Sequence, residues 1–481
     1  MDVRMKSAGF LQAWGRWLSW LPSLRAVFAT TGLTAGAMFV GLLCVLFGGM
    51  AEDRPALVVV LPVLLLTGFL FIYSRPALLA VILLLRAGTN PVFEETRLPV
   101  LGGLGGLMNL VVIVIAVLII SRDPKRVPRQ AWWVFLPFVL TQSIALVYSP
   151  EPAIAARLFL GYLSMVALFL TAFFLVTDEH ELDKLLKLVA WSSLPVALVT
   201  LAYIALGKTA GAVDALEEAG RRFGGPFPHA NILAFYLVLA QGVIFYLWKS
   251  RRLGGGTLTR TAVVAYMLLL IGLLFATKTR SAWVSLLFLF IVYGLLRERR
   301  YLLYLLLGGA LAMLLPEVHE RVMGIFEGNQ VVQYAKLNSF AWRKLIWTDG
   351  LSWMSTARYG MGYGLESFAF HSTTFFSMAG GRSWGAHSVI VQLFFETGLM
   401  GLLAFVWVYV AAARLTLKLG REASLMKVVF LALLAANFLV STSDNMLGYL
   451  VYNWYFWLVM GGVCALGWRS HVADRSPTVV S

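Results

Sequence analysis

Apolar stretches of about 20 residues, separated by short polar segments, recur along almost the whole of this 481-residue chain. A helix of that length crosses a hydrocarbon core of about 30 Å, and backbone groups in lipid need hydrogen-bond partners inside the spanning structure. The stretches are continuous and lack the alternation of apolar and polar positions that barrel strands show. The pattern therefore predicts an all-α polytopic membrane protein with about 12 to 14 transmembrane helices.

The positions of basic clusters set the expected orientation of these spans. Lys and Arg concentrate on the cytoplasmic side of membrane proteins, and the clusters here are Arg122–Arg126, Lys249–Arg252, Arg297–Arg300 and Arg414–Lys427. Counting from a cytoplasmic N-terminus, all of them face the cytoplasm only if the short segment 76–88 also crosses. The expected spans are 30–50, 56–73, 76–88, 101–121, 131–148, 154–176, 186–206, 231–248, 261–277, 281–296, 301–315, 387–411, 427–444 and 447–467.

This topology divides the chain into successive parts. The stretch 316–386 is the longest polar-rich connection, and its tryptophans and charges predict amphipathic helices that lie over the membrane. The parts are a cytoplasmic interfacial segment (1–28), an N-terminal transmembrane bundle (29–206), central transmembrane helices with outer-face arginine loops (207–315), a large periplasmic loop (316–386), C-terminal transmembrane helices (387–468) and a cytoplasmic tail (469–481).

Composition excludes several classes of protein. Hydrophobic residues make up 60% and charged residues 13% of the chain, whereas soluble domains carry about a quarter charged residues. The net charge of +15 lies in clusters between spans, which does not indicate a nucleic-acid-binding face. Cys44 and Cys464 fall inside apolar stretches, and neither an acidic pair of the Asp-x-Asp kind for a divalent cation nor a glycine-rich nucleotide loop is present. The sequence therefore predicts neither a metal site nor a cofactor.

Two connections carry cations on the outer side, where the preference of Lys and Arg for the cytoplasmic side does not account for them. One is the run Arg221–Asn231, in which glycines and prolines surround Arg221 and Arg222. The other is the turn Thr277–Trp283, where Lys278 and Arg280 are held between spans at the interface. Arginine binds phosphate oxygens with a two-pronged guanidinium. Both segments are therefore candidates for binding a phosphate, although a solvated loop or lipid headgroup contact is the alternative.

Two further outer segments carry candidate chemistry. Arg343 lies on a predicted amphipathic helix, which fits either a substrate contact or anionic lipid. His387 stands at the outer start of a span, and its ordinary pKa near 6.5 suits a proton acceptor, although a helix-start histidine is often structural. Glu396 lies within the same apolar stretch. A carboxylate is costly there, so we expect it to have a functional or a structural role.

These motifs resemble those of the O-antigen ligase and Wzy polymerase superfamily. The run from His387 to Gly401, His-Ser-x5-Phe-x-Glu-x-Gly-x-x-Gly, resembles the C-terminal signature of that family. Similar elements are Gly360-Met-Gly-Tyr-Gly364 followed by Phe368, Thr279-Arg-Ser-Ala-Trp283, and Arg222-x-x-Gly225 with Asn231-x-x-Ala234. Order and spacing agree from about residue 200 to 410. Ser388 follows the histidine where family members often have asparagine, and it can still cap a helix.

The resemblance implies a membrane glycosyltransferase of the GT-C type that inverts the anomeric centre and needs no metal. Its donor would be a glycan on undecaprenyl pyrophosphate, and its acceptor a hydroxyl of lipid A-core, a growing glycan or a protein side chain. Carried over by motif, Arg222 and Arg280 would hold the pyrophosphate and His387 would activate the acceptor. Further contacts with the substrates are expected from Arg221, Lys278, Arg343, Tyr363 and Glu396.

The leading hypothesis is thus an O-antigen ligase in the bacterial inner membrane, with its active site facing the periplasm. A repeat-unit polymerase or a protein O-oligosaccharyltransferase is the alternative within the same class. A transporter is the alternative from another class, but the chain lacks the repeated halves and broken midplane helices that transporters show. The expected partners are the lipid-linked donor, the acceptor and membrane lipids, and no nucleic acid.

Overall fold

The computed structural model describes residues 66–95, 104–209, 222–323 and 339–473. Within these ranges the regular elements are α-helices and short 3-10 helices, with no strand among the described residues. The chain is therefore an all-α polytopic membrane protein, as the hydrophobic pattern predicts. The predicted interfacial segment 1–28, the span 30–50, most of the span 56–73 and the tail from 474 lie outside the described residues.

Each span predicted between residues 76 and 467 corresponds to one helix. By length and composition, α8 to α12 and α18 to α20 are suited to cross a membrane, while α7, α13 and α14 are apolar but shorter. The helices are α5 (Arg75–Arg86), α6 (Asn90–Glu95), α7 (Leu104–Ile120), α8 (Arg129–Val147), α9 (Pro152–Leu175), α10 (Glu179–Ala205), α11 (Ala230–Lys249), α12 (Thr257–Ala276), α13 (Arg280–Leu296), α14 (Arg300–Ala312), α15 (Pro316–Met323), α16 (Ser339–Trp353), α17 (Ser367–Phe375), α18 (Val389–Leu417), α19 (Ser424–Ser441) and α20 (Leu450–Ala473).

Helix α10 begins at Glu179, well ahead of the predicted span at 186. Its first turns are polar, so a hydropathy pattern does not register them. The side chain of Asp178 caps the helix, since its Oδ1 accepts a hydrogen bond from the backbone N–H of Glu181 at 3.0 Å.

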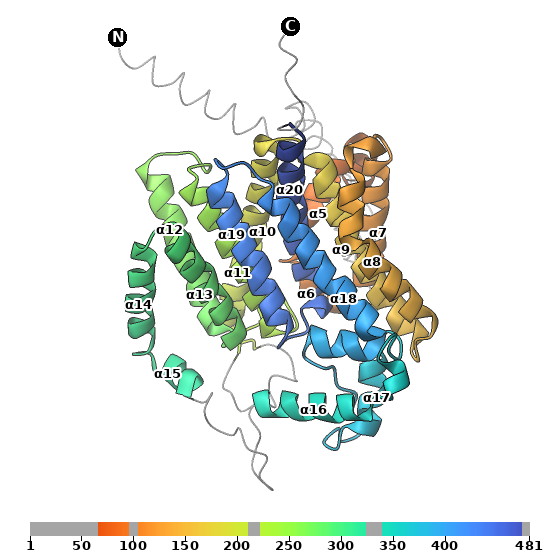
Figure 1. The fold of residues 1–481 in the computed structure, drawn as a ribbon. Coiled ribbons are helices and arrows are strands. Elements are labelled where there is room, and N and C mark those ends of the chain that lie inside the picture. Colours follow the sequence, from red (N-terminus) through yellow and green to blue (C-terminus); the bar gives the residue numbers. More distant parts are fainter. Residues whose placement is uncertain (1–65, 96–103, 210–221, 324–338, 474–481) are drawn as a thin grey trace, which may run out of the picture. The chain divides into compact units, whose positions relative to one another are not determined.

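The chain divides into two compact units, Met1–Leu84 and Leu85–Ser481. In the first, the described residues form the helix 66–73 and the larger part of α5. In the second, α11 and α20 are the central helices, because 94% of the apolar window of each is buried. Helix α20 packs on α9, α10 and α18, and α11 packs on α10, α12, α13 and α19 (Figure 1).

Aromatic rings fill the space around α20. Trp457 meets Phe135 edge-on with ring centroids 4.9 Å apart, and Tyr409 at 5.6 Å. Lipid tails are as apolar as the side chains, so close packing between helices stabilises such a bundle more than removal from water does. Large rings in edge-to-face contact provide that packing.

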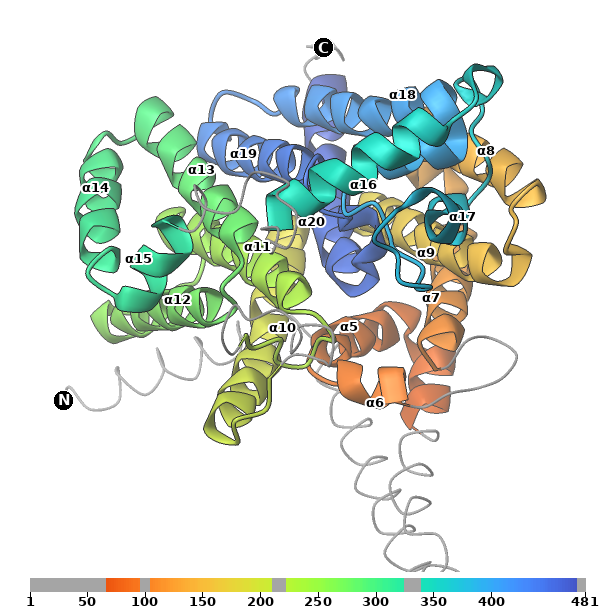
Figure 2. The same ribbon diagram turned by 90° about the horizontal axis from the view of Figure 1, so that it is seen from below.

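The predicted large loop contains α15, α16, the 3-10 turn Thr356–Arg358 and α17. Helices α16 and α17 share an apolar core with the start of α18, and α16 lies across the ends of α18 and α19 (Figure 2). The buried members of this core are Ile346, Met354, Phe368, Phe376, Ala379, Ala386 and Phe395. The prediction of helices in this segment is therefore correct, and α16 and α17 are packed onto the bundle at the end where α18 begins.

Helix α18 is broken at Gly398, which has φ +62°. The segment Tyr359–Gly364 pairs with this break: the N–H groups of Tyr363 and Gly364 donate to the carbonyls of Phe395 and Glu396 at 3.0 and 2.8 Å. In return, the N–H of Leu399 donates to the carbonyl of Tyr359 at 2.8 Å. A Cβ at position 398 would collide with the backbone of Gly360. Gly398 and Gly362, whose added Cβ would collide with the backbone of Glu396, are thus explained by one backbone-to-backbone docking.

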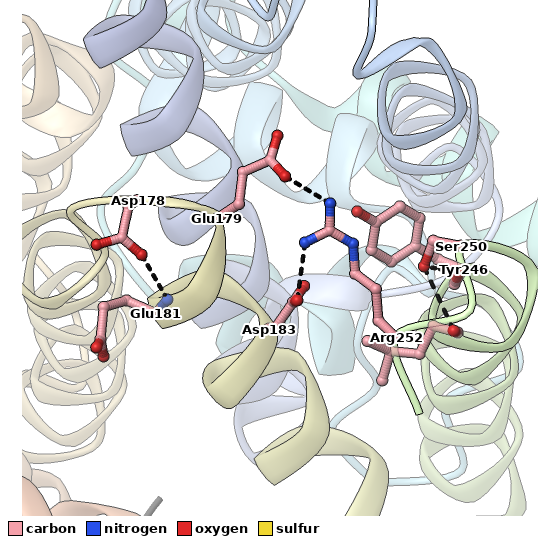
Figure 3. Close-up of polar contacts among 8 residues, drawn as sticks. Asp178, Glu179, Glu181, Asp183, Tyr246, Ser250 and Arg252 are labelled. Atoms are coloured by element: carbon pink, nitrogen blue, oxygen red, sulfur yellow. Dashed lines mark hydrogen bonds and ion pairs between the residues drawn. The ribbon is translucent and has the colours of Figure 1, made fainter. Parts of the chain in front are cut away.

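Just after the C-terminal end of α11, Arg252 connects this helix with α10. Its Nη2 lies 2.5 Å from Glu179 Oε2 and its Nη1 lies 2.8 Å from Asp183 Oδ2, so the guanidinium sits between two carboxylates of α10 (Figure 3). This ion-pair group belongs to one of the predicted cytoplasmic basic clusters.

Candidate active site

Arg222 ties together the segments at the start of α11 and between α12 and α13. It is 9% exposed, and its Nε donates to the carbonyl of Thr277 at 3.1 Å. Its Nη2 donates to Asn231 Oδ1 at 2.7 Å and to Thr279 Oγ1 at 3.2 Å. The fork of the guanidinium makes such multiple bonds possible. Arg222 is therefore held in one orientation, and its charge lies at the end of the bundle where α11 and α13 begin.

The chain before α11 can approach α10 closely because residue 225 is glycine. Gly225 has φ +54°, and a Cβ there would collide with the hydroxyl of Thr200. The left-handed conformation and the lack of space both require glycine at this position.

The turn between α12 and α13 carries the other predicted cations. Lys278 has φ +53°, an uncommon conformation for a residue with a side chain, and Arg280 is the first residue of α13. Thr279 precedes the helix and is buried, as is Thr277. The N-terminus of a helix carries a partial positive charge, which adds to that of the two side chains. The turn is thus a place where an anion is stabilised.

A buried carboxylate, Asp444, stands next to the Arg222 group. It follows the end of α19 and has no exposed surface. Its Oδ2 accepts from Asn231 Nδ2 at 2.9 Å, and its Oδ1 accepts from the Tyr449 hydroxyl at 2.6 Å and from the N–H of Asn445 at 3.0 Å. Asn231 therefore bridges cation and carboxylate, because its oxygen faces Arg222 and its nitrogen faces Asp444. Burial, together with the Asp444 charge, raises the pKa of Tyr449 well above its ordinary value, so the phenol remains a donor.

His387 is fixed by its backbone neighbours just before α18 begins. It has φ +50°, Trp347 Nε1 donates to the carbonyl of Ala386 at 2.5 Å, and Ser388 caps α18 by accepting from the N–H of Val391 at 3.3 Å. The imidazole meets the ring of Trp342 edge-on at 5.6 Å. A strained conformation that the surroundings enforce is a reason to look for function at that residue.

The imidazole of His387 is neutral at pH 7. Burial, with smaller contributions from the Arg343 cation and His229, lowers its pKa to about 4 against the opposing effect of the Asp444 carboxylate. Arg343 is itself fixed on α16, because its Nη1 donates to the carbonyl of Ser443 at 2.5 Å, next to Asp444. His387, Arg343 and Asp444 thus form one electrostatic group, and His387 can accept a proton there.

The predicted residues Tyr363 and Glu396 belong to the break in α18. Glu396 is 1% exposed and accepts from Gln392 Nε2 at 3.1 Å and from backbone N–H groups of Glu366 and Phe368 at the start of α17. The hydroxyl of Tyr363 accepts from the N–H of Ser355 at 2.8 Å. Both residues hold the segment around α17 in place, and their expected contact with substrate stays a prediction. Arg221 lies outside the described residues.

A chain of amides links the break in α18 to Asp444. Gln392 donates to Glu396 and accepts from Asn445 Nδ2 at 2.7 Å, and Asn445 follows Asp444 directly. The sequence motif at His387–Gly401 is therefore connected to Asp444 through hydrogen bonds.

Sequence reasoning missed Asp444, Asn445, Gln392 and Tyr449 as site residues, and Asn231 was noticed only as part of a motif. One signal was available, since Asp444 is the only acidic residue between Glu422 and Asp474. Its placement at the edge of the predicted span 427–444 hid its position at the end of the helix. In the part of the chain that the structure describes, no group of three or more His, Cys, Asp or Glu side chains could hold a metal ion.

Residues 265–406 match the family model described as O-antigen ligase, Wzy_C. This match, which covers less than half of the chain, supports a place in the O-antigen ligase and Wzy polymerase superfamily. The match includes Lys278, Arg280, Arg343 and His387, while Arg222 and Asp444 lie on either side of it and meet it through the fold. No curated protein matches the chain significantly. The match therefore supports a membrane glycan enzyme of the ligase and polymerase kind.

Proposed function

We propose that this O-antigen ligase family member transfers a glycan from undecaprenyl pyrophosphate to an acceptor hydroxyl of lipid A-core at the periplasmic face of the bacterial inner membrane. The observation that carries the proposal is the grouping of Arg222, Asp444, Arg343 and a neutral His387 at one end of the bundle. Cations for a pyrophosphate and a base for a hydroxyl are the two requirements of such a transfer.

The donor would bind to the cationic side of the site. Arg222 is held by Thr277, Asn231 and Thr279, and the turn it contacts carries Lys278 and Arg280. As the glycosidic bond breaks, negative charge grows on the pyrophosphate, and fixed cations stabilise that charge without reorganising. Guanidinium groups suit this task because they bind phosphate oxygens in pairs.

The acceptor would bind on the His387 side. A neutral imidazole can take the proton of the attacking hydroxyl, and its low pKa keeps it in that form at pH 7. Arg343 beside it disfavours the protonated imidazole, which favours passing the proton onward. A single displacement by the hydroxyl inverts the anomeric centre and requires no covalent glycosyl-enzyme intermediate.

The charge pattern supports the periplasmic orientation. The basic cluster Lys249–Arg252 lies at the opposite end of α11 from Arg222, and such clusters mark the cytoplasmic side. The end with His387 would then face the periplasm, where lipid-linked glycans are available and nucleotide donors are not.

Two experiments test this function. In the first, purified protein in proteoliposomes receives a polyprenyl-pyrophosphate glycan and lipid A-core, and the product is followed by gel shift; no product refutes the proposal. In the second, the gene is deleted and surface glycans are run on a gel. Loss of long chains on lipid A supports a ligase. Single-repeat products, or loss of a free polysaccharide only, indicate a polymerase instead.

A further inference from the structure

A buried cation lies at the end of α5, outside the region that matches the family. Arg86 is 5% exposed, and its guanidinium carbon lies 4.5 Å from the centre of the Phe93 ring and 5.9 Å from that of Trp454. A charge buried in a membrane bundle is costly and is kept for a specific contact. The aromatic faces offset part of that cost.

Arg86 also donates a hydrogen bond to the side-chain amide of Asn90. Its Nη1 donates to Asn90 Oδ1 at 2.6 Å, and Asn90 Nδ2 donates to the carbonyl of Pro226 at 3.1 Å. Asn90 is itself buried. Because the arginine occupies the amide oxygen, the amide nitrogen must face Pro226. The cation therefore fixes the direction of the Asn90 side chain.

Pro226 belongs to the short stretch that carries Arg222 into the site. That stretch is also held by the N–H of Phe223, which donates to the carbonyl of Ala276 at 3.3 Å, and by the close approach of Gly225 to Thr200. Asn90 adds a contact from the N-terminal part of the chain. Removing it would leave the Pro226 carbonyl buried without this donor and would loosen the stretch between Arg222 and α11.

We propose that Arg86 and Asn90 are positioning residues for the donor subsite: they hold the carbonyl of Pro226 and thereby keep Arg222 aligned with the pyrophosphate. The role rests on the proposed function, because the pyrophosphate donor defines what Arg222 binds. Neither residue touches the substrate in this arrangement. Their effect is on donor affinity, through Arg222, and not on the acceptor side at His387.

The proposal predicts a specific kinetic signature. Arg86→Met and Asn90→Leu should each raise the donor KM roughly three- to tenfold, about the effect of losing one neutral hydrogen bond, because both residues act on the donor only through Arg222. The acceptor KM should not change. The double variant should be no worse than either single one, because both changes break the same chain of contacts. Arg86→Lys keeps the charge and a donor, so its donor KM should return partway toward wild type.

Arg252→Met is the matched control, because it removes a part-buried arginine with carboxylate partners at the opposite end of α11 (Figure 3). It should lower the yield or melting temperature and leave the donor KM unchanged. Initial rates are measured in proteoliposomes against donor and against acceptor, per amount of folded protein. If the Arg86 and Asn90 variants lose folded protein but keep the wild-type donor KM, the positioning role is wrong while the proposed function stands. If wild type makes no product, both are wrong.

Discussion

The carboxylate of Asp444 is the residue whose replacement tests the site geometry most sharply. In Asp444→Asn the side chain keeps its shape, but one oxygen becomes an NH2 group. The carboxylate accepts from Asn231 at 2.9 Å, from Tyr449 at 2.6 Å and from the N–H of Asn445 at 3.0 Å. Whichever way the new amide turns, its NH2 group faces a donor.

The expected loss follows from the hydrogen bonds that change. A hydrogen bond to a charged group contributes about 1.5–3 kcal/mol, and each 1.4 kcal/mol corresponds to about one decade. If Asn231 turns its amide in response, its oxygen no longer faces Arg222. We therefore expect Asp444→Asn to lower kcat/KM for transfer by about one to two decades.

The assay is the initial rate of glycan transfer in proteoliposomes, with folded protein quantified by size-exclusion chromatography. Asp183→Asn is the matched control, because Asp183 is a buried carboxylate that accepts from Arg252 at the other end of the bundle. Its variant should transfer at the wild-type rate per folded molecule. Wild-type transfer by Asp444→Asn, or an equal loss in the control, would refute the reasoning.

Further predictions concern His387, the break in α18 and metals. Because the pKa of His387 is lowered to about 4, its neutral form persists as the pH falls below 6.5, so kcat/KM should decline only near pH 4; a midpoint at about 6.5 contradicts this. Gly398→Ala forces a side chain into φ +62° and against Gly360, so the melting temperature should fall by several degrees for about 1–3 kcal/mol of strain; an unchanged melting temperature contradicts the docking described. Transfer should survive EDTA, and loss of activity that a divalent cation restores would contradict the arginine-based account.

Much of the fold could be predicted because a span in lipid has a large, local signature. The apolar stretches predict each helix from α7 to α14 and from α18 to α20, with approximate bounds. The break at Gly398 could not be predicted, since it depends on the backbone of Gly360, which approaches only in the folded chain. The polar first turns of α10 were missed because hydropathy does not detect a helix that continues beyond the membrane.

The site could be predicted in part, for a similar reason. A cation or a histidine on the outer side is unusual, so the sequence identifies Arg222, Arg343 and His387 as candidates. The structure brings these residues to the same end of the bundle. Asp444 was missed because its partners are brought to it by the fold: Asn231 belongs to α11, and Tyr449 lies directly before α20. Glu396 was noticed for its rarity in an apolar stretch, but its bonds to the start of α17 arise from tertiary packing.

In the proposed mechanism, cations bind the pyrophosphate donor and His387 activates the acceptor. The most direct measurement is donor binding and glycan transfer for His387→Ala and Arg280→Ala in the same membranes, with expression matched. We expect His387→Ala to bind the donor as wild type does and to lose about two to four decades in the rate of transfer. Arg280→Ala should lose both donor affinity and transfer, the latter by about two to three decades. Near-normal transfer by His387→Ala would contradict the account, because His387 would then serve only the start of α18.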